Sequence, residues 1–336
     1  MKIALVYAEY KEMTEEIEKI NPNADTHMEN IVKSITDALT SYGHEVIKVP
    51  ANIDLLRNII EIDGLDCIFC HYAPMENLNL QGNVFAALEL LGIPIVGSGM
   101  FTQALGLSKE TTKVILRSIG LPTAKSQVFM TPDDKLSDEL AERFPLFVKP
   151  EAEAASVGVE ADSYVENEEE LRKTLNRIFS EVNPPILVEE YLPGREFTVG
   201  VLEEDPVIAI PVMELKFSED ATTEFQSLET KLEKSLIKEV PAKIDDALAK
   251  EMQDMAIKAF KALRCDVYGR VDFRLDKHGR PSIIEFNTMP GLEKGKSFFA
   301  DSCEVIGISY EELINKMVDI TMRKTEYDKN LGIGKF

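Results

Sequence analysis

The sequence contains no tryptophan, and only four of its 336 residues are cysteine. Four scattered cysteines do not make a disulfide framework. Cys67 and Cys70 form a CxxC pair, but they lie inside the apolar run LDCIFC, so a buried strand is favoured over a redox or zinc site. No apolar run reaches the roughly 18 residues of a membrane span, so we expect no membrane partner.

Basic residues are also scarce, because 37 lysines and arginines stand against 59 acidic residues, a net charge of −22. This balance argues against nucleic-acid binding, whose affinity comes from lysine and arginine on phosphates, and against anionic membrane surfaces. The N-terminus MKIALVYAEY lacks a small-residue cleavage site and predicts a first strand rather than a signal peptide. We therefore expect a cytoplasmic protein with no nucleic-acid partner.

The first part of the chain alternates apolar runs with amphipathic segments, which predicts a doubly wound parallel α/β sheet over residues 1–100. Ligands bind beyond the carboxyl ends of such strands. His71 follows the third strand there, although a lone histidine in this place is more often structural than catalytic. The predicted strands are 2–8, 44–51, 65–73 and 93–99, and the predicted helices are 27–43, 53–62 and 81–91.

Beyond residue 100 the pattern is mixed α+β, and we predict two further domains, 101–190 and 191–336, because one compact core cannot accommodate the whole chain. The polar segment 217–235 has no strong period and is typical of a functional loop. The predicted helices are 102–119, 133–144, 166–181, 245–263 and 309–322. The predicted strands are 125–130, 145–150, 207–215 and a pair on either side of a Pro-Gly turn at Pro193-Gly194.

The stretch YGRVDFRLDKHGRPSIIEFNTMPG is the most informative part of the chain and predicts two strands joined by a polar turn. Because strand side chains alternate, Asp272, Glu285 and Asn287 share one face beside Arg270 if the two carboxylates lie opposite each other. Oxygen ligands without histidine or cysteine suit a hard cation such as Mg²⁺. Arg270 suits an anion that gains charge during a reaction. A solvated surface hairpin is the alternative.

Two other segments carry signals for phosphate or nucleotide binding. Lys149 ends the predicted strand PLFVKP and precedes a small-residue loop with Ser156, an arrangement that suits a phosphate cradle. A surface lysine beside a flexible loop is the alternative. The strand, turn and strand of PPILVEEYLPGREFTVGVL place Glu189 before the turn and Glu196 after it, and an exposed strand is the alternative for Glu189 alone.

The motif GRVDF followed by IIEFNTMPG resembles the metal-binding end of ATP-grasp enzymes and, more narrowly, of D-alanine–D-alanine ligases. The resemblance covers roughly residues 1–322. It implies an N-terminal pre-ATP-grasp domain followed by a two-part α+β ATP-grasp domain, with ATP and Mg²⁺ (or Mn²⁺) as cofactors. It also implies small amino-acid or short-peptide substrates, a homodimer, and a carboxylate–amine ligase that works through an acyl phosphate.

The resemblance assigns roles by position. Asp272, Glu285 and Asn287 would hold the metal, and Arg270 would stabilise the phosphoryl-transfer and tetrahedral states. The implied nucleotide-binding residues are Lys109, Lys149, Glu189, Glu190, Tyr191, Leu192, Glu196 and Lys231. The other implied catalytic residues are His71 and Ser156, and the implied substrate-binding residues are Glu76, Gly291, Lys296 and Ser297.

The amino-acid half of the resembled site is incomplete. The family begins with a Gly-rich turn whose glutamate positions the first substrate's amine, and residues 7–28 have no such turn. Ala155 replaces the first of two serines in the phosphate loop, and Leu232 falls near the place of a family tyrosine. Three members of one hydrogen-bond network are absent together. The alternatives are a ligase with a substrate pair other than D-alanine, a phosphotransferase that stops at the acyl phosphate, and a nucleotide-binding homologue without ligase activity.

Overall fold

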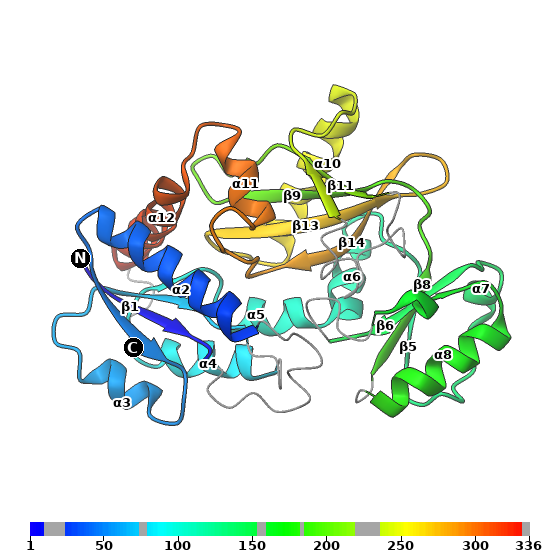
Figure 1. The fold of residues 1–336 in the computed structure, drawn as a ribbon, viewed down its shortest axis with the longest axis horizontal. Coiled ribbons are helices and arrows are strands. Elements are labelled where there is room, and N and C mark those ends of the chain that lie inside the picture. The colour runs from blue at the N-terminus through cyan, green and yellow to red at the C-terminus, as the bar shows by residue number, and fades with distance from the viewer. Residues whose placement is uncertain (10–23, 74–78, 153–158, 182–184, 219–235, 331–336) are drawn as a thin grey trace.

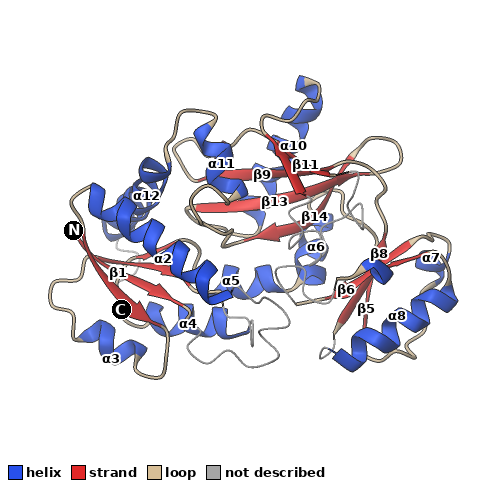
Figure 2. Ribbon diagram, in the orientation of Figure 1, coloured by secondary structure: helices blue, strands red, loops and turns tan. Residues whose placement is uncertain are grey.

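The computed structural model describes residues 1–9, 24–73, 79–152, 159–181, 185–218 and 236–330, which form three β-sheets and the helices around them (Figures 1 and 2). The predictions for Glu76, Ser156 and Lys231, the replacements Ala155 and Leu232, and most of the loop 217–235 lie outside the described residues. None of the helices in the described ranges combines the length and apolarity needed to cross a membrane. The predicted domain boundaries, cytoplasmic location and homodimer stay predictions.

The N-terminal sheet is parallel, as predicted, with strand order β2-β1-β3-β4. The run Ile3–Val6 is fully buried, because β1 lies between two strands and helices cover both faces. Figure 1 shows α2 and the C-terminal α12 above the sheet and α3 and α4 below it. The elements are β1 (Lys2–Tyr7), β2 (Glu45–Pro50), β3 (Cys67–His71), β4 (Ile95–Val96), α2 (Ala24–Ser41), α3 (Leu55–Ile60), α4 (Asn79–Glu89) and α12 (Tyr310–Asn330).

The second sheet is antiparallel, in the order β5-β8-β6-β7, and is covered by α8. The predicted helix 133–144 is wrong in extent, since only α7 (Asp138–Ala141) is helical. The Asp134 carboxylate accepts hydrogen bonds from the N–H groups of Met130 and Thr131, at 2.6 and 3.1 Å, and this local turn competes with the helix. The other elements are β5 (Ser126–Phe129), β6 (Leu146–Pro150), η1 (Ala161–Ser163), β7 (Tyr164–Val165), α8 (Glu168–Glu181) and β8 (Ile186–Glu190).

The third sheet is antiparallel in the order β12-β11-β9-β13-β14, with β10 paired to β9. The single predicted strand 207–215 is wrong, because Pro211 cannot donate to a ladder and separates β10 from β11. β12 and α11 are two further elements that were not predicted from the sequence. The elements are β9 (Glu196–Leu202), β10 (Ile208–Ala209), β11 (Met213–Phe217), β12 (Leu236–Glu239), α10 (Asp246–Ala262), β13 (Tyr268–Leu275), β14 (Pro281–Asn287) and α11 (Phe298–Glu304).

The two faces of the third sheet differ in chemistry. Along β9, the alternate side chains of Phe197, Val199 and Val201 belong to the apolar core that includes α10. Glu196 and Thr198 alternate with these residues along the strand and therefore point to the opposite face. On the neighbouring β13, residues 271, 273 and 275 join the same core, and residues 270, 272 and 274 share the polar face. The polar face of this sheet carries the candidate site.

The predicted helix 102–119 is two helices, α5 (Met100–Leu107) and α6 (Lys109–Ser118). Ser108 has extended backbone angles and caps α6, because its hydroxyl accepts from Thr111 N. The same hydroxyl donates to Glu151 Oε1 at 2.6 Å, just after β6. The break therefore places Lys109 at the start of a helix that is fastened to the second sheet.

The Pro-Gly turn after β8 does not close a hairpin, because β8 belongs to the second sheet and β9 to the third. Gly194 fastens this link to β13. Its N–H donates to Leu275 O at 2.9 Å, and its carbonyl accepts from Nε and Nη2 of Arg274, both at 3.2 Å. A Cβ at position 194 would lie 2.6 Å from Leu275 O, a contact that only glycine avoids.

We predict that Gly194→Ala lowers the free energy of unfolding by about 1–3 kcal/mol, because the added methyl meets the backbone carbonyl and the Cβ of Leu275, which cannot swing away as the end of a long side chain can. Gly291→Ala is the matched control, since a Cβ there meets no atom of the described residues within 4 Å. Urea unfolding at neutral pH measures both. Equal stability of the two variants would contradict the close approach of the link to β13.

Candidate active site

The buried carboxylate of Asp272 is the centre of the polar face. β13 pairs with β14 so that Asp272 lies opposite Glu285 and Arg270 opposite Asn287, which confirms the predicted register. Asp272 is 3% exposed and accepts two bonds from Arg270, Nε to Oδ1 and Nη2 to Oδ2, both at 2.8 Å. Burial raises the pKa of Asp272, but the Arg270 charge and hydrogen bonds outweigh it and hold the pKa below its usual range. The carboxylate is therefore ionised.

Two features of this hairpin were missed in the sequence. Thr198 on β9 donates its hydroxyl to Asp272 Oδ1 at 2.6 Å, and Asn287 Nδ2 donates to Oδ2 at 2.9 Å, so four donors orient one carboxylate. The register also shifts after Asp272, since Phe273 pairs with Ile283 and leaves residue 284 as a bulge. The bulge re-aims Glu285, whose side chain keeps 34% of its surface exposed.

Lysines from α6 and β6 lie across from the hairpin. Lys109 Nζ is 3.7 Å from Glu285 Oε1 and 3.4 Å from the carbonyl of Glu151. Burial lowers the pKa of Lys109, which Glu285 only partly offsets. A small pocket between α6 and β14 is lined by Lys109, Lys113 and Glu285, among others. The predicted carboxylates and one predicted phosphate lysine therefore share one site.

Glu189 at the end of β8 is held between two lysines. Lys149 Nζ lies 2.6 Å from Oε1, and Lys113 Nζ pairs with Oε2. Burial raises the pKa of Glu189, but the two ammonium charges outweigh it and hold the pKa at about 2. A phosphate-binding role was predicted for Lys109 and not for Lys113, although the spacing of four residues puts both on one helix face. Glu190 points elsewhere and pairs with Arg143 at 3.2 Å.

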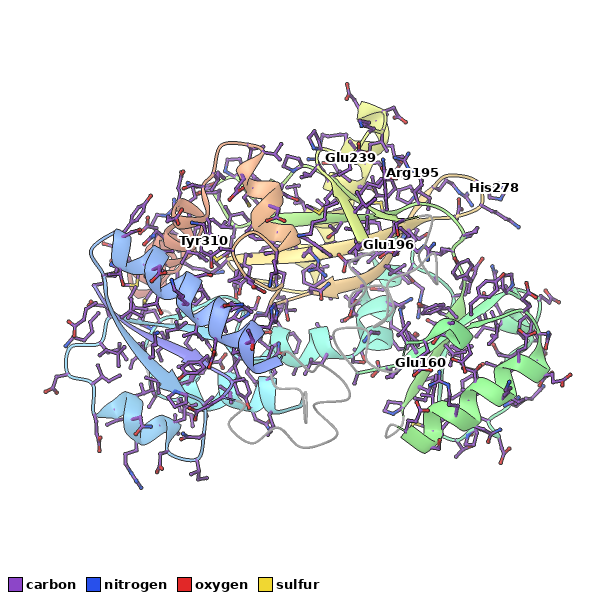
Figure 3. All side chains as sticks on the ribbon, in the orientation of Figure 1. Glu160, Arg195, Glu196, Glu239, His278 and Tyr310 are labelled. Carbon is purple, nitrogen blue, oxygen red and sulfur yellow. The ribbon has the colours of Figure 1, made fainter. Side chains whose placement is uncertain are left out.

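The segment after Glu189 meets β13 through Arg274, a residue to which the sequence analysis gave no role. The Arg274 guanidinium lies 5.0 Å from the centre of the Tyr191 ring, and its Nη1 is 4.0 Å from Glu196 Oε2. Leu192 is buried beside them. Figure 3 labels Glu196 at the end of β9 nearest β8. Tyr191 and Glu196, two of the predicted nucleotide residues, therefore lie against one buried arginine.

Three of the predicted substrate residues, Gly291, Lys296 and Ser297, lie between β14 and α11. Ser297 caps α11, because its hydroxyl accepts from Ala300 N at 3.2 Å and donates to Gly291 O. Lys296 pairs with Glu293 at 2.7 Å.

His71 ends β3 and is buried, and its Nδ1 has no hydrogen-bond partner among the described residues.

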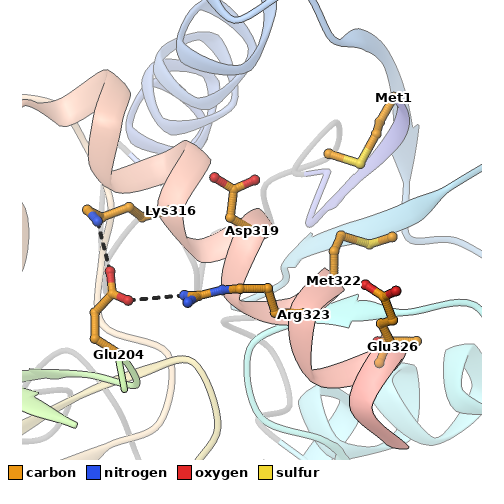
Figure 4. Close-up of a pocket in the computed structure, with 8 residues that line it drawn as sticks. Met1, Glu204, Lys316, Asp319, Met322, Arg323 and Glu326 are labelled. Atoms are coloured by element: carbon orange, nitrogen blue, oxygen red, sulfur yellow. Dashed lines mark hydrogen bonds and ion pairs between the residues drawn. The ribbon is translucent and has the colours of Figure 1, made fainter. Parts of the chain in front are cut away.

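A separate cavity of about 640 Å³ lies beside α12 (Figure 4). Its cations are already paired, since Glu204 accepts from Lys316 at 2.8 Å and from Arg323 at 3.0 Å. None of the predicted site residues lines it. The lining residues are Met1, Glu204, Lys316, Asp319, Met322, Arg323, Thr325 and Glu326.

Comparisons with known proteins relate this chain to one family of enzymes. The family model described as the D-ala D-ala ligase C-terminus matches residues 115–319. The D-alanine–D-alanine ligase of Halalkalibacterium halodurans is 32% identical over 296 residues, which cover 87% of this chain and 93% of that protein. The D-alanine–D-alanine ligase of Oceanobacillus iheyensis is 34% identical over 281 residues, or 80% of this chain and 72% of that protein.

Solved structures share the fold. The D-alanine–D-alanine ligase of Bacillus anthracis, complexed with ATP, has a TM-score of 0.75 at 24% identity and covers 98% of this chain and 99% of its own. The VanG D-Ala:D-Ser ligase of Enterococcus faecalis has a TM-score of 0.76 at 22% identity and covers 95% of this chain and 99% of its own. At these identities the likeness concerns the fold alone.

His71 gives the site a pH-dependent contribution to stability. Burial lowers its pKa from 6.5 to about 4. Below pH 6.5 the unfolded chain therefore binds a proton that the folded protein does not. We predict that the free energy of unfolding falls by up to about 1.4 kcal/mol per pH unit on this account between pH 6.5 and 4, and that His71→Asn removes this slope.

Urea unfolding at half-unit pH steps measures the slope. His278→Asn, at an exposed histidine in the turn of the hairpin (Figure 3), is the control and is expected to keep the wild-type profile. An unchanged slope in His71→Asn would show that the imidazole is not buried as described.

Proposed function

The chain belongs to the D-alanine–D-alanine ligase family, and from this premise we propose that it joins the carboxylate of one amino acid to the amine of another at the cost of ATP. The γ-phosphoryl group of ATP passes to the carboxylate, which gives an acyl phosphate and ADP. The amine attacks the acyl carbon, loses a proton, and phosphate leaves. D-Alanine is the first candidate for both substrates, as in the curated relatives.

One observation supports this proposal above the others: the oxygen atoms of the hairpin and the buried lysines of α6 and β6 meet in one place. Glu285 lies 3.7 Å from Lys109. Burial lowers the pKa of Lys149 and of Arg270, but Glu189 beside the former and Asp272 beside the latter, each with a smaller contribution from Glu285, outweigh it and raise both pKa values. Catalysis of phosphoryl transfer consists mainly of positioning and charge neutralisation, and these groups supply both.

The nucleotide is proposed to lie between the second and third sheets. Lys109 and Lys149 neutralise the phosphates, and Glu196 accepts from the ribose hydroxyls. The N–H groups of Glu190 and Tyr191 already donate to Lys125 O at 2.8 Å and Pro145 O at 3.2 Å. The contact from a main-chain N–H to the adenine edge therefore falls to Leu192.

The metal site would be formed by Asp272, Glu285 and Asn287, whose oxygens are the ligands that Mg²⁺ or Mn²⁺ prefers. No cluster of three or more His, Cys, Asp or Glu suited to a metal occurs in the described part of the chain. Two carboxylates and one amide oxygen leave room for phosphate oxygens and water. When bound, the ion would neutralise charge on the phosphates.

Arg270 is proposed to stabilise the negative charge that develops on the acyl oxygen. Its two hydrogen bonds to Asp272 fix the plane of the guanidinium, and the guanidinium carbon Cζ lies 5.4 Å from the centre of the Phe298 ring. A fixed cation in a partly buried place stabilises developing charge without reorganisation during the reaction. Arg270→Lys would not reproduce this arrangement, because an ammonium lacks the planar fork of a guanidinium.

A ligase for a different amino-acid pair is the second candidate. The replacements Ala155 and Leu232 support it, because the family places hydrogen-bonding side chains at those positions. The intact set of Asp272, Glu285 and Asn287 speaks against a nucleotide-binding protein without catalysis.

Measurement of ADP release over a panel of D- and L-amino acids tests the proposal. We predict ADP release that depends on ATP, on a divalent cation and on an amino acid. Strong turnover with D-alanine alone would reject the second candidate, and higher turnover with another pair would establish it. ATP binding without ADP release over the whole panel would contradict the ligase assignment. ADP release that needs no amine would indicate a phosphotransferase.

We predict that Glu285→Gln lowers kcat by at least about a hundredfold, because it removes one charge from the proposed metal and phosphate site. The fold is expected to persist, because Glu285 is partly exposed and Lys109 retains its hydrogen bond to the carbonyl of Glu151. Glu251→Gln, at an exposed position of α10, is the control. Wild-type kcat in Glu285→Gln would remove this carboxylate from the mechanism.

A further inference from the structure

Glu293 is a buried carboxylate that the proposed reaction does not yet use. It follows Gly291 by two residues, where the loop after β14 meets α2. His27 Nδ1 contacts its Oε2 at 2.5 Å, and Asn30 Nδ2 donates to its Oε1 at 3.2 Å. Burial raises the pKa of Glu293, but Lys296 and His27 outweigh it and hold the pKa below its ordinary range. The Glu293 carboxylate is therefore ionised: it accepts hydrogen bonds but is a weak base.

The cation on this carboxylate comes from a surface side chain. Lys296 Nζ lies 2.7 Å from Glu293 Oε1, but the Lys296 side chain is 66% exposed and that of Glu293 only 6%. An exposed lysine gains little from such a pair, because water and the entropy of the long side chain compete with it. The ammonium group of a ligand can therefore replace that of Lys296 on Glu293. The position of the Lys296 ammonium marks where the ligand's ammonium would bind.

A second observation at the same junction points to a ligand. The buried Nδ1 of His71 lacks a partner among the described residues, and buried polar atoms are ordinarily hydrogen-bonded. His27 lies close enough for its charge to act on His71. His71 also stands at the carboxyl end of β3, the edge of a parallel sheet where ligands bind.

We propose that Glu293 binds the α-ammonium group of the amino acid whose carboxylate is activated, and that this ammonium displaces Lys296. The inference rests on the proposed function and names the residue that recognises its first substrate. The released Lys296 then offers its charge to the carboxylate of the second amino acid. An ammonium that stays protonated suits Glu293, because the attacking amine must lose its proton and the activated amino acid's amine need not.

The test uses hydroxylamine as the amine, so that ATP-dependent hydroxamate formation reports on the activated amino acid alone. Glu293→Gln keeps the shape and removes the charge. It is expected to raise the KM of that amino acid about tenfold or more and to leave the KM of ATP unchanged. Glu311→Gln is the matched control, since it removes a nearby exposed pair with Lys294 at 2.5 Å.

Two further readouts separate recognition from a structural role. Lys296→Gln removes the competing internal ammonium, so the KM of the activated amino acid is expected to fall severalfold. For the wild type, kcat/KM is expected to be higher with the amino acid than with the same acid without its amino group. In Glu293→Gln the ratio of these two kcat/KM values is expected to be about tenfold smaller. An active Glu293→Gln enzyme with unchanged KM and unchanged preference would overturn the inference.

Calorimetry keeps the inference testable without turnover. D-Alanine is titrated into the protein with a non-hydrolysable ATP analogue, and Glu293→Gln is expected to weaken binding about tenfold relative to the wild type. Failure of the wild type to release ADP over the panel counts against the proposed function. Equal D-alanine affinity in the two proteins counts against the role of Glu293. Absence of D-alanine binding in both counts against D-alanine as the substrate, and the titration is then decided with the amino acid that gives the most hydroxamate.

Discussion

The Glu189 carboxylate, held between Lys113 and Lys149, is the interaction on which the site depends. It joins α6, β6 and β8, which come from different parts of the chain. The Lys113 and Lys149 ammonium groups and the Glu189 carboxylate together carry one net positive charge, whereas the charge of Lys109 on the same helix is offset by Glu285. A protein with a net charge of −22 thereby concentrates positive charge where an anionic nucleotide is proposed to lie. Without Glu189 the two lysines would be buried like charges, which cost stability.

The opposite wall of the site depends on strand alternation. The register of β13 and β14 is fixed because residues 271, 273 and 275 must face the apolar core under α10, which leaves Arg270 and Asp272 on the polar face. Thr198 and Asn287 then hold the carboxylate in one orientation. A rigid carboxylate and a rigid guanidinium are what a site needs if it works by positioning rather than by covalent chemistry.

Much of this could be predicted from the sequence, for local reasons. The alternation of YGRVDF sets the polar face of β13, and regular apolar runs set the parallel sheet. Ser108 and Pro211 are visible signals of a break that the predicted helix and strand overran. Other features depend on contacts between distant residues. The N–H of Gly194 binds Leu275, and β8 and β9 enter different sheets although their sequences look alike. No local pattern reports such pairings.

The same distinction separates the two halves of the proposed active site. The nucleotide half is built mainly from neighbouring strands and one helix, so its residue types and spacings are constrained together. The junction at Glu293 joins residues 266 positions apart, through the contact with His27. A change in either segment alters this junction while leaving the lysines and the hairpin in place. Substrate choice can therefore diverge within the family while the ATP-dependent step is retained, and a carboxylate that reaches the junction from the loop after β14 is one physical route to that divergence.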